Sequence, residues 1–549
     1  MTGATAGDGG TRTADGRRGH GFGFAALFTV LGTVLPGLGL IVAGWRKVGA
    51  VVLLLTVATL VVVGVRVGSD PIAAAGSVLG GDRLRTIEVV AIAAGLAWAV
   101  VVVCTARALR PPRGGTGPRA AMSALVGVLC LLVLAPTALA ASVVDSTHHA
   151  LTTIFTNGPS ATVEQSDAPR SSGDPWAGKA RVNVLLLGGD AGPTAGGGIR
   201  SGLRTDTVIV ASIDTHTGNT VLFSVGRNTQ RLAFQPGTPL AEAYPGGYAS
   251  NPDAVRTGAI SENWLDSIYD DVPAQHPGLL GPTANEGADA LKLGLGYSLF
   301  GDQHAIDYYV LISLRGFQQV VNALGGLTVN VTKPVPIGGS VGVGGAPDTL
   351  PTAWIMTSRD RHLDGHDALW FARGRYDSND RERAARQRCT INALTNQATP
   401  ARVLASYASL ADTAADVTKT DIVPARFPAL LALANRVKSA TRSSLSIDSS
   451  GIPDFDQYRP DWAEVRAVVK TAIQRSNPAT SPSPTPGRTA TAPRATSGAT
   501  ATPTVPAGGA DIQSDLDTTC AWDPTAAAAN LKAWQDSWSS RYNDDGTRR

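Results

Sequence analysis

Four long apolar runs near the start of the chain constrain its fold more than any other feature of the sequence. They cover residues 21–45, 48–65, 89–106 and 120–144, and none contains a charged residue. Each is about as long as the roughly 18–20 residues that a helix needs to cross a bilayer. In lipid such runs must be helical, because nothing there pairs with a bare N–H or C=O group. Buried core helices are the alternative, but four clustered runs favour an N-terminal bundle of about four transmembrane helices.

The charges that flank these runs do not orient the bundle. With four spans, six basic residues fall on each side, so the positive-inside rule gives a tie. The strongest basic cluster, at residues 107–119, favours a cytoplasmic third loop and an external location for everything after residue 144. Pro36 lies between glycine-rich flanks in the first run, a pattern typical of a broken or re-entrant segment.

The remaining chain divides by composition into further parts. We assign residues 1–20 to a polar tail, 21–144 to the membrane region, 145–178 to a stalk, 179–476 to a globular domain, 477–510 to a linker and 511–549 to a C-terminal tail. The linker is rich in Ser, Thr, Pro and Ala and cannot bury a core, so we expect it to be disordered. The net charge of +3 is too balanced to argue for a nucleic-acid partner.

The globular part alternates strand-like and helix-like patterns. Strands are predicted at residues 182–187, 207–213, 220–225, 308–313 and 327–331, and helices at 316–323, 381–397 and within 401–474. The strand–helix–strand unit at 308–331 predicts an α/β fold with a mixed central sheet flanked by helices.

Arginines and aspartates gather at the ends of these predicted strands and at the start of the long helix. Asp190 ends the first strand, Arg204 and Asp206 open the second, Arg227 and Arg231 follow the third, and the later segment supplies Arg373, Arg375, Asp380, Arg383 and Gln387. Arg373 and Arg375 alternate as on a strand, which would point them in the same direction. Arg383 and Gln387 are four apart and share one helical face.

Such a set of side chains suits a phosphate or pyrophosphate, which Arg holds through paired N–H bonds. The aspartates would repel that ligand unless a cation lies between them, and Mg²⁺ prefers carboxylate, water and phosphate oxygens. A salt-bridge network on a solvated face is the alternative interpretation.

A series of short motifs, taken together and in order, is more specific than any one of them alone. In sequence order, the chain has Leu185-Leu186-Leu187-Gly188-Gly189-Asp190, Arg204-Thr205-Asp206-Thr207, Ser224 to Asn228, Gly316-Phe317, Ala323-Leu324-Gly325-Gly326, Leu363-Asp364-Gly365, Ala368-Leu369, Arg373-x-Arg375 and Asp380-x-x-Arg383-x-x-Arg386-Gln387. Over residues 182–394 the chain therefore resembles the LytR–CpsA–Psr family of envelope phosphotransferases.

The resemblance implies an α/β domain with an apolar tunnel for a polyprenyl tail and an arginine-lined mouth for its pyrophosphate. By the same analogy Asp190 and Asp206 ligate Mg²⁺, and Arg227, Arg373, Arg375 and Asp380 are catalytic. The pyrophosphate would be bound by Arg204, Arg227, Arg231, Arg373, Arg375, Arg383 and Gln387. The implied reaction moves a glycopolymer from its polyprenyl-pyrophosphate carrier to peptidoglycan, on the outer side of the cell membrane, with membrane lipid as a further partner. Teichoic acid, arabinogalactan and capsule all remain open as the polymer.

Some residues depart from the family pattern and keep alternatives open. Gly226 and Asn228 stand where the family usually has Pro and Asp, and His366 stands where it often has Glu. Asn228 can neither carry charge nor act as a base. A polyprenyl-pyrophosphate pyrophosphatase and a non-catalytic envelope-binding or regulatory protein are therefore the alternatives.

Four cysteines are divided between the two parts of the chain. Cys104 and Cys130 lie inside predicted spans. Cys389 and Cys520 lie in the external part, where disulfides persist, so we expect them to pair; two free thiols are the alternative.

Overall fold

The computed structural model describes residues 22–69, 83–109, 116–154, 160–162, 176, 178–190, 203–248, 264–340, 348–398, 418–423, 426–477 and 515–549. Most of the predicted stalk and, apart from residue 477, the whole predicted linker lie outside these residues. The chain forms two compact units, one of Met1–Ala74 with Asp82–Asp145 and one of Ala75–Gly81 with Ser146–Arg549.

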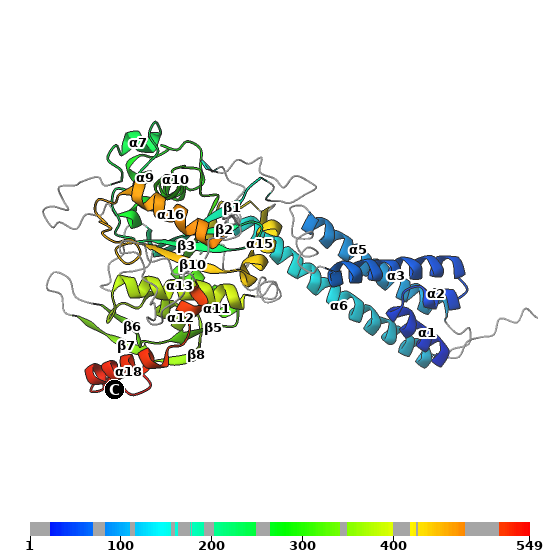
Figure 1. The fold of residues 1–549 in the computed structure, drawn as a ribbon. Coiled ribbons are helices and arrows are strands. Elements are labelled where there is room, and N and C mark those ends of the chain that lie inside the picture. The colour runs from blue at the N-terminus through cyan, green and yellow to red at the C-terminus, as the bar shows by residue number, and fades with distance from the viewer. Residues whose placement is uncertain are drawn as a thin grey trace, which may run out of the picture. The chain divides into compact units, whose positions relative to one another are not determined.

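The first unit is helical throughout its described part (Figure 1). Its helices are α1 (Phe22–Val34), α2 (Leu38–Val42), α3 (Arg46–Ser69), α5 (Arg83–Ala108) and, up to Asp145, α6 (Thr116–Ile154). Three segments among the described residues are long and apolar enough to cross a membrane, and they are Arg46–Arg66, Arg85–Ala108 and Gly117–Ser142.

The first apolar run is broken, so that about four predicted spans become three of spanning length. The residue before a proline is disfavoured in the α conformation, and α1 ends at Val34, two residues before Pro36. Gly37 follows with a φ of 99°, and α2 then runs for five residues. A Cβ on Gly37 would collide with the backbone of Gly49 in α3, so only glycine permits this close approach.

A six-stranded sheet forms the centre of the second unit. Its order is β10-β3-β2-β1-β4-β9. The strands are β1 (Arg181–Asp190), β2 (Arg204–Asp214), β3 (Thr220–Val225), β4 (Tyr308–Ser313), β9 (Thr418–Thr420) and β10 (Arg442–Ile447). The pairs β1–β2, β2–β3 and β4–β9 are antiparallel, whereas β1–β4 and β3–β10 are parallel, so the sheet is mixed as predicted.

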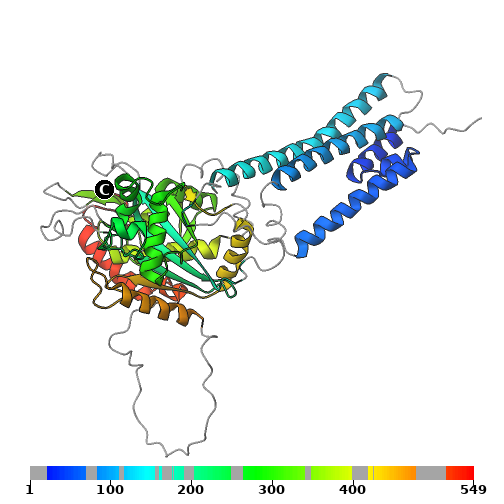
Figure 2. The same cartoon turned by 90° about the horizontal axis from the view of Figure 1, so that it is seen from above.

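Helices cover both faces of this sheet, as Figure 1 shows. On one face α9 (Ile268–Gln275), α10 (Glu286–Phe300) and α16 (Trp462–Ser476) bury the main apolar core, in which Leu187, Phe223 and Leu291 are fully buried. Helix α16 lies at the surface of this layer (Figure 2). On the other face Ile391 of α13 (Asp380–Gln397) packs against the sheet. Near-continuous apolar strands such as β3 are explained by this two-sided cover.

Two small antiparallel sheets of two strands each carry a second core. Strand β5 (Leu327–Val331) pairs with β8 (Ser358–Leu363), and β6 (Val335–Ser340) pairs with β7 (Thr349–Ile355). Helices α11 (Leu314–Ala323) and α12 (Gly365–Arg373) border them. The strand–helix–strand unit at 308–331 therefore exists, but β4 and β5 belong to different sheets; the fold class predicted from this unit is nevertheless confirmed.

The remaining elements complete the unit. They are α7 (Pro239–Ala243), the 3₁₀ turn η1 (Leu265–Ser267), α15 (Phe427–Ser439), α17 (Leu516–Thr519) and α18 (Pro524–Trp538). The helical prediction for 401–474 missed strand β10, whose polar, serine-rich sequence has no apolar strand pattern.

Candidate active site

An irregularity between β1 and β2 places Asp206. Gly188 pairs with Thr207 and Gly189 pairs with Thr205, so Asp206 is the extra residue of a β-bulge. A bulge turns its extra side chain away from the regular alternation, and bulges are common next to active sites. The Asp206 carboxylate forms an ion pair with Arg227, which follows the end of β3.

The start of α13 brings a second carboxylate to the same place. Asn379 caps this helix by accepting a hydrogen bond from the backbone N–H of Glu382 at 2.9 Å. Asp380 follows the cap, and its oxygens lie 2.8 Å from Arg375, 3.6 Å from Arg383 and 4.0 Å from Arg227. One carboxylate thus holds three guanidiniums from three segments of the chain. We call Arg227, Arg375, Arg383, Asp206 and Asp380 the arginine network.

Burial and neighbouring charges act on this network in opposite directions. Burial lowers the pKa of Arg227, but the nearby carboxylates, chiefly Asp206, outweigh that effect and hold its pKa above the ordinary value. Burial lowers the pKa of Arg383, and the positive charges of Arg227 and Arg375 add to the decrease. The three guanidiniums are therefore close enough to influence one another.

The network also contains two buried donors that make no hydrogen bond to the described residues. The Nε atoms of Arg227 and Arg383 are buried and have no hydrogen-bond partner within the described part of the chain. A buried donor left unpaired costs about 1–3 kcal/mol, and more when the group is charged. This arrangement suits an anion that is not a side chain of the described residues. The N-terminus of an 18-residue helix beside it adds partial positive charge.

Helix α13 also fixes the neighbouring strand and loop. Gln387 donates a hydrogen bond from Nε2 to the hydroxyl of Thr207 at 2.9 Å, which ties α13 to β2 beside the bulge. Arg386 donates from Nε to the carbonyl of Phe371 at 2.7 Å and from a terminal nitrogen to the carbonyl of Gly374. It therefore holds the loop that carries Arg375. Burial lowers the pKa of Arg386 to about 10, so it remains charged near neutral pH.

The predicted strand at Arg373 and Arg375 is wrong. Helix α12 ends at Arg373, and Arg375 lies in the loop that follows, so the strand period of two does not apply. The guanidinium carbon of Arg373 lies 5.4 Å from the centre of the Trp370 ring, whereas Arg375 reaches Asp380.

Arg231 lies apart from the arginine network in the described structure. It adopts a φ of 53° and lines a pocket of about 640 Å³ together with Phe234, Tyr244 and Trp462. No ion pair found among the described residues joins it to the network.

Asp266 is a site residue that the sequence analysis missed. It is 2% exposed, pairs with Arg204 at 3.5 Å and donates its backbone N–H to the carbonyl of Arg227 at 3.2 Å. It belongs to a short 3₁₀ turn in a stretch that lacks family motifs, so no sequence signal marks it.

The residues predicted to bind Mg²⁺ come from adjacent strands. The backbone of Asp190 pairs with Arg204 at the end of β2 that also carries Asp206. The side chain of Asp190 lies outside the described structure, while that of Asp206 is part of the arginine network. Carboxylates are the ligands that Mg²⁺ prefers, and the partly exposed Asp206 stands beside guanidiniums suited to phosphate. Of the predicted pair, the Asp206 carboxylate is therefore a ligand type and a location that suit Mg²⁺.

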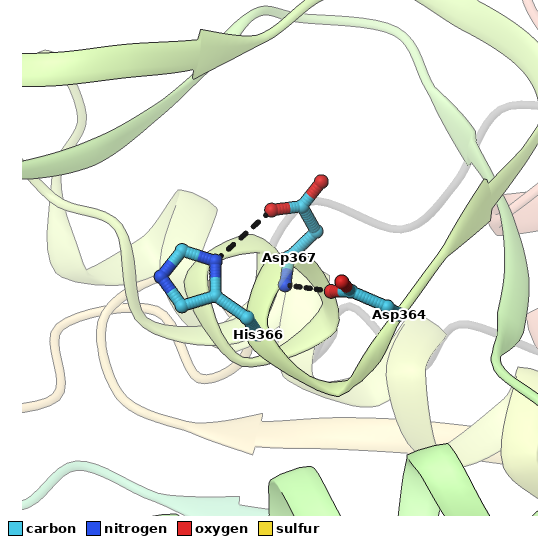
Figure 3. Close-up of side chains that lie close together, drawn as sticks. All are labelled: Asp364, His366 and Asp367. Atoms are coloured by element: carbon cyan, nitrogen blue, oxygen red, sulfur yellow. Dashed lines mark hydrogen bonds and ion pairs between the residues drawn. The ribbon is translucent and has the colours of Figure 1, made fainter.

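A separate acidic cluster at the start of α12 does not fit a metal. Ligand atoms of Asp364, His366 and Asp367 lie within 4.8 Å of one another (Figure 3). His366 accepts a hydrogen bond from the indole of Trp370 at Nε2 and meets Asp367 at Nδ1, each at 3.1 Å, so both ring nitrogens are engaged. Asp364 caps the helix by accepting from the backbone of Asp367. These contacts account for the cluster as a helix start.

Comparison with known proteins gives a consistent family. Residues 301–471 match the model of the LytR_cpsA_psr family. The chain is 25% identical over 246 residues to the polyisoprenyl-teichoic acid–peptidoglycan teichoic acid transferase TagU of Enterococcus faecalis, a match that covers 44% of this chain and 62% of that one. It is 24% identical over 323 residues to the cell wall biosynthesis protein LcpA of Corynebacterium glutamicum, with 54% and 57% covered.

The crystal structure of Bacillus subtilis TagV matches with 22% identity and a TM-score of 0.35, over 54% of this chain and 97% of that one. The match to the first of these curated relatives spans about three fifths of its length.

Proposed function

We propose that the protein is a membrane-anchored phosphotransferase, because residues 301–471 match the model of the LytR_cpsA_psr family. It moves a glycopolymer from a polyprenyl-pyrophosphate carrier to peptidoglycan. Its relatives in Enterococcus faecalis and Oceanobacillus iheyensis are polyisoprenyl-teichoic acid–peptidoglycan teichoic acid transferases, which supports this class of donor and acceptor.

One observation carries the proposal. Guanidiniums from the end of β3, the loop after α12 and the first turns of α13 converge on Asp380, and two of them keep buried donors unpaired. The ion pairs within the network do not provide these two donors with a hydrogen bond among the described residues. A pyrophosphate would accept from them, and charge-assisted hydrogen bonds to phosphate are among the strong ones in proteins.

The reaction needs positioning and charge neutralisation from the protein. An acceptor hydroxyl of peptidoglycan attacks the phosphorus that carries the glycan, and the bond from that phosphorus to the bridging oxygen breaks. Polyprenyl phosphate leaves with the bridging oxygen, and the hydroxyl proton passes to solvent. Arg227, Arg375 and Arg383 bind the pyrophosphate and stabilise the charge that develops on it. Asp380 orients these three arginines.

Asp190 and Asp206 would hold Mg²⁺ at the edge of the same network. When bound, the cation neutralises phosphate charge and so permits two carboxylates to lie beside the substrate.

The break in the first apolar run supports an external catalytic domain. If α1 and α2 enter the membrane without crossing it, three spans remain. One side of the membrane then carries nine basic residues, which come from the N-terminal tail, the start of α3 and the connection between α5 and α6. The other side carries three, in the connection between α3 and α5. The positive-inside rule places the nine in the cytoplasm and therefore everything after α6 outside.

The test uses the full chain in detergent with a polyprenyl-pyrophosphate-linked glycan, peptidoglycan fragments and Mg²⁺. We expect polyprenyl phosphate and glycan-linked peptidoglycan to form together, and Arg375→Ala to abolish both. Arg359→Ala is the matched control, because Arg359 is 72% exposed on β8 and pairs only with its neighbour Asp360 among the described contacts.

Other outcomes separate the alternatives. Polyprenyl phosphate formed without any acceptor would establish a pyrophosphatase instead. Unchanged turnover in Arg227→Ala would refute the catalytic role of the network.

A further inference from the structure

The C-terminal segment of residues 515–549 docks on the domain beside the arginine network. It follows a long stretch outside the described residues, yet it is tied back covalently by a disulfide between Cys389 in α13 and Cys520. Cys389 lies two residues after Gln387, so the tie is made to the helix that carries the site.

A first set of contacts fixes the start of this segment to α13 and the sheet. Leu516 is fully buried against the core that includes Ile391 of α13. The carboxylate of Asp517 accepts hydrogen bonds from Asn392 at 2.7 Å and from Arg442 at 2.9 Å. Such a combination of apolar burial, charge pairing and a covalent bond is typical of a stable docking contact rather than of a loose tail.

A second set of contacts lies around Trp354 of β7. Trp354, Trp534 and Tyr542 are at most 3% exposed and form one aromatic cluster with Trp538. The hydroxyl of Tyr542 donates to the carbonyl of Pro351 at 2.6 Å. Residues after α18 also pair with β7, since the backbone N–H of Trp354 donates to the carbonyl of Gly546 at 2.9 Å.

The aromatic cluster reaches the loop that carries Arg375. Tyr376 is the next residue in the chain, and its ring centre lies 5.8 Å from that of Trp538 in an edge-to-face contact. The ring also lies so close to Gly339 of β6 that a Cβ there would be 2.9 Å from Tyr376. The ring of Tyr376 therefore contacts both β6 and the C-terminal segment.

Arg386 supports the same loop from α13, whereas Tyr376 supports it from the C-terminal segment. Arg375 itself is 44% exposed, so its own contacts restrain it weakly. A backbone held on both sides of an exposed arginine reduces the entropy lost when that arginine binds its ligand.

We propose that residues 515–549 are a disulfide-anchored clamp in which Trp538 acts as a positioning residue for Arg375 through Tyr376. The pyrophosphate affinity of the site therefore depends on a segment that supplies no member of the arginine network. The identity of the anion rests on the proposed function, but the clamp is tested by binding alone.

The first experiment measures the dissociation constant of inorganic pyrophosphate with Mg²⁺ by calorimetry on the full chain in detergent. We expect Trp538→Ala to weaken binding roughly tenfold, the scale of one misplaced charge-assisted hydrogen bond, and Trp538→Phe to restore most of it. Lys532→Ala is the control, because Lys532 is 76% exposed on the same helix. A variant that merely unfolds in part would bind with lower stoichiometry and an unchanged dissociation constant, and that result would overturn the proposal.

A double-mutant cycle identifies the route. In the Arg375→Ala background, Trp538→Ala should have no further effect, because the arginine that it positions is already gone. Additive losses would refute the coupling through Tyr376.

The covalent anchor gives a second, independent readout. A thiol reductant should weaken pyrophosphate binding by the native chain by a similar factor and should not affect Cys520→Ser further. Unchanged affinity in the fully reduced chain would refute the role of the disulfide. If the native chain bound no pyrophosphate at all, the proposed function would fail. If the native chain and the tail variants bound pyrophosphate equally well, only the clamp would be refuted.

Discussion

Asp380→Asn is the substitution that most directly tests the arginine network. It removes one charge while keeping the size of the side chain and its place in the first turn of α13. Asp380 contacts Arg375, Arg383 and Arg227 at 2.8, 3.6 and 4.0 Å and is 39% exposed. The asparagine leaves three neighbouring guanidiniums with Asp206 as the only other carboxylate of the network.

The expected losses in kcat and Tm follow from the number and exposure of these ion pairs. Partly exposed pairs contribute about 0.5–1 kcal/mol each, so three of them contribute about 1.5–3 kcal/mol to the gathered arrangement. At 1.36 kcal/mol per decade this corresponds to roughly a 10- to 150-fold loss in kcat if catalysis needs all three arginines gathered. For a unit of about 400 residues the same energy lowers Tm by about 2–4 °C.

The assay compares kcat, pyrophosphate affinity and Tm in one set of samples. Pyrophosphate competes with Asp380 for the same guanidiniums, so it should bind Asp380→Asn more tightly than the native chain. The deficit in Tm should then shrink at saturating pyrophosphate. Asp377→Asn is the matched control, since Asp377 is an exposed neighbour three residues away.

Two results would refute this reasoning. One is a native kcat in Asp380→Asn, which would show that the carboxylate does not orient the arginines. The other is a Tm deficit that pyrophosphate leaves unchanged, which would mean that Asp380 serves the fold and not the site.

Three further predictions test the metal, a buried ion pair and the response to pH. Asp206→Asn should raise the Mg²⁺ concentration for half-maximal activity by roughly tenfold or more, and an unchanged Mg²⁺ titration would exclude it as a ligand. Lys292→Met should lower the unfolding free energy by about 3–5 kcal/mol in a urea titration, because it leaves the buried Asp421 unpaired; a loss under 1 kcal/mol would contradict this. Burial acts to raise the pKa of Asp214, but hydrogen bonds within its own turn and from Asn477 outweigh it, so the pKa lies below its ordinary value. A depressed carboxyl pKa contributes stability above the unfolded-state pKa near 4, and that stability is lost as the pH falls through the lower folded-state pKa. The Tm of Asp214→Asn should therefore fall less than that of the native chain between pH 6 and 3, and parallel curves would refute the assignment.

Local patterns predicted the elements well where a residue's own neighbours decide its conformation. The apolar strands at 182–187 and 220–225 and the helix that follows Asp380 are present with similar bounds. Patterns failed where packing decides. Strand β10 is rich in serine and is a strand because it pairs with β3 and lies under α16 and α17, not because of its own periodicity.

The site was predictable only where local spacing along one element decides which side chains share a face. The helical spacing of Arg383 and Gln387 predicted a shared face, and both side chains do lie toward β2 and the arginine network. The spacing of Arg373 and Arg375 misled, because α12 ends between them. Asp266 was not predictable, since its role arises only when η1 packs against the end of β2.

The sequence by itself determined the helical membrane unit, the α/β class of the second unit and the kinds of charge available at its strand ends. These follow from apolar length, periodicity and side-chain chemistry, which act over a few residues. The tertiary structure alone decided that the break in the first apolar run packs against α3, that one carboxylate gathers three arginines, and that a segment beyond residue 514 returns to hold the Arg375 loop. Each of these depends on groups far apart in the chain, and only the close packing of the fold selects which of their many possible contacts forms.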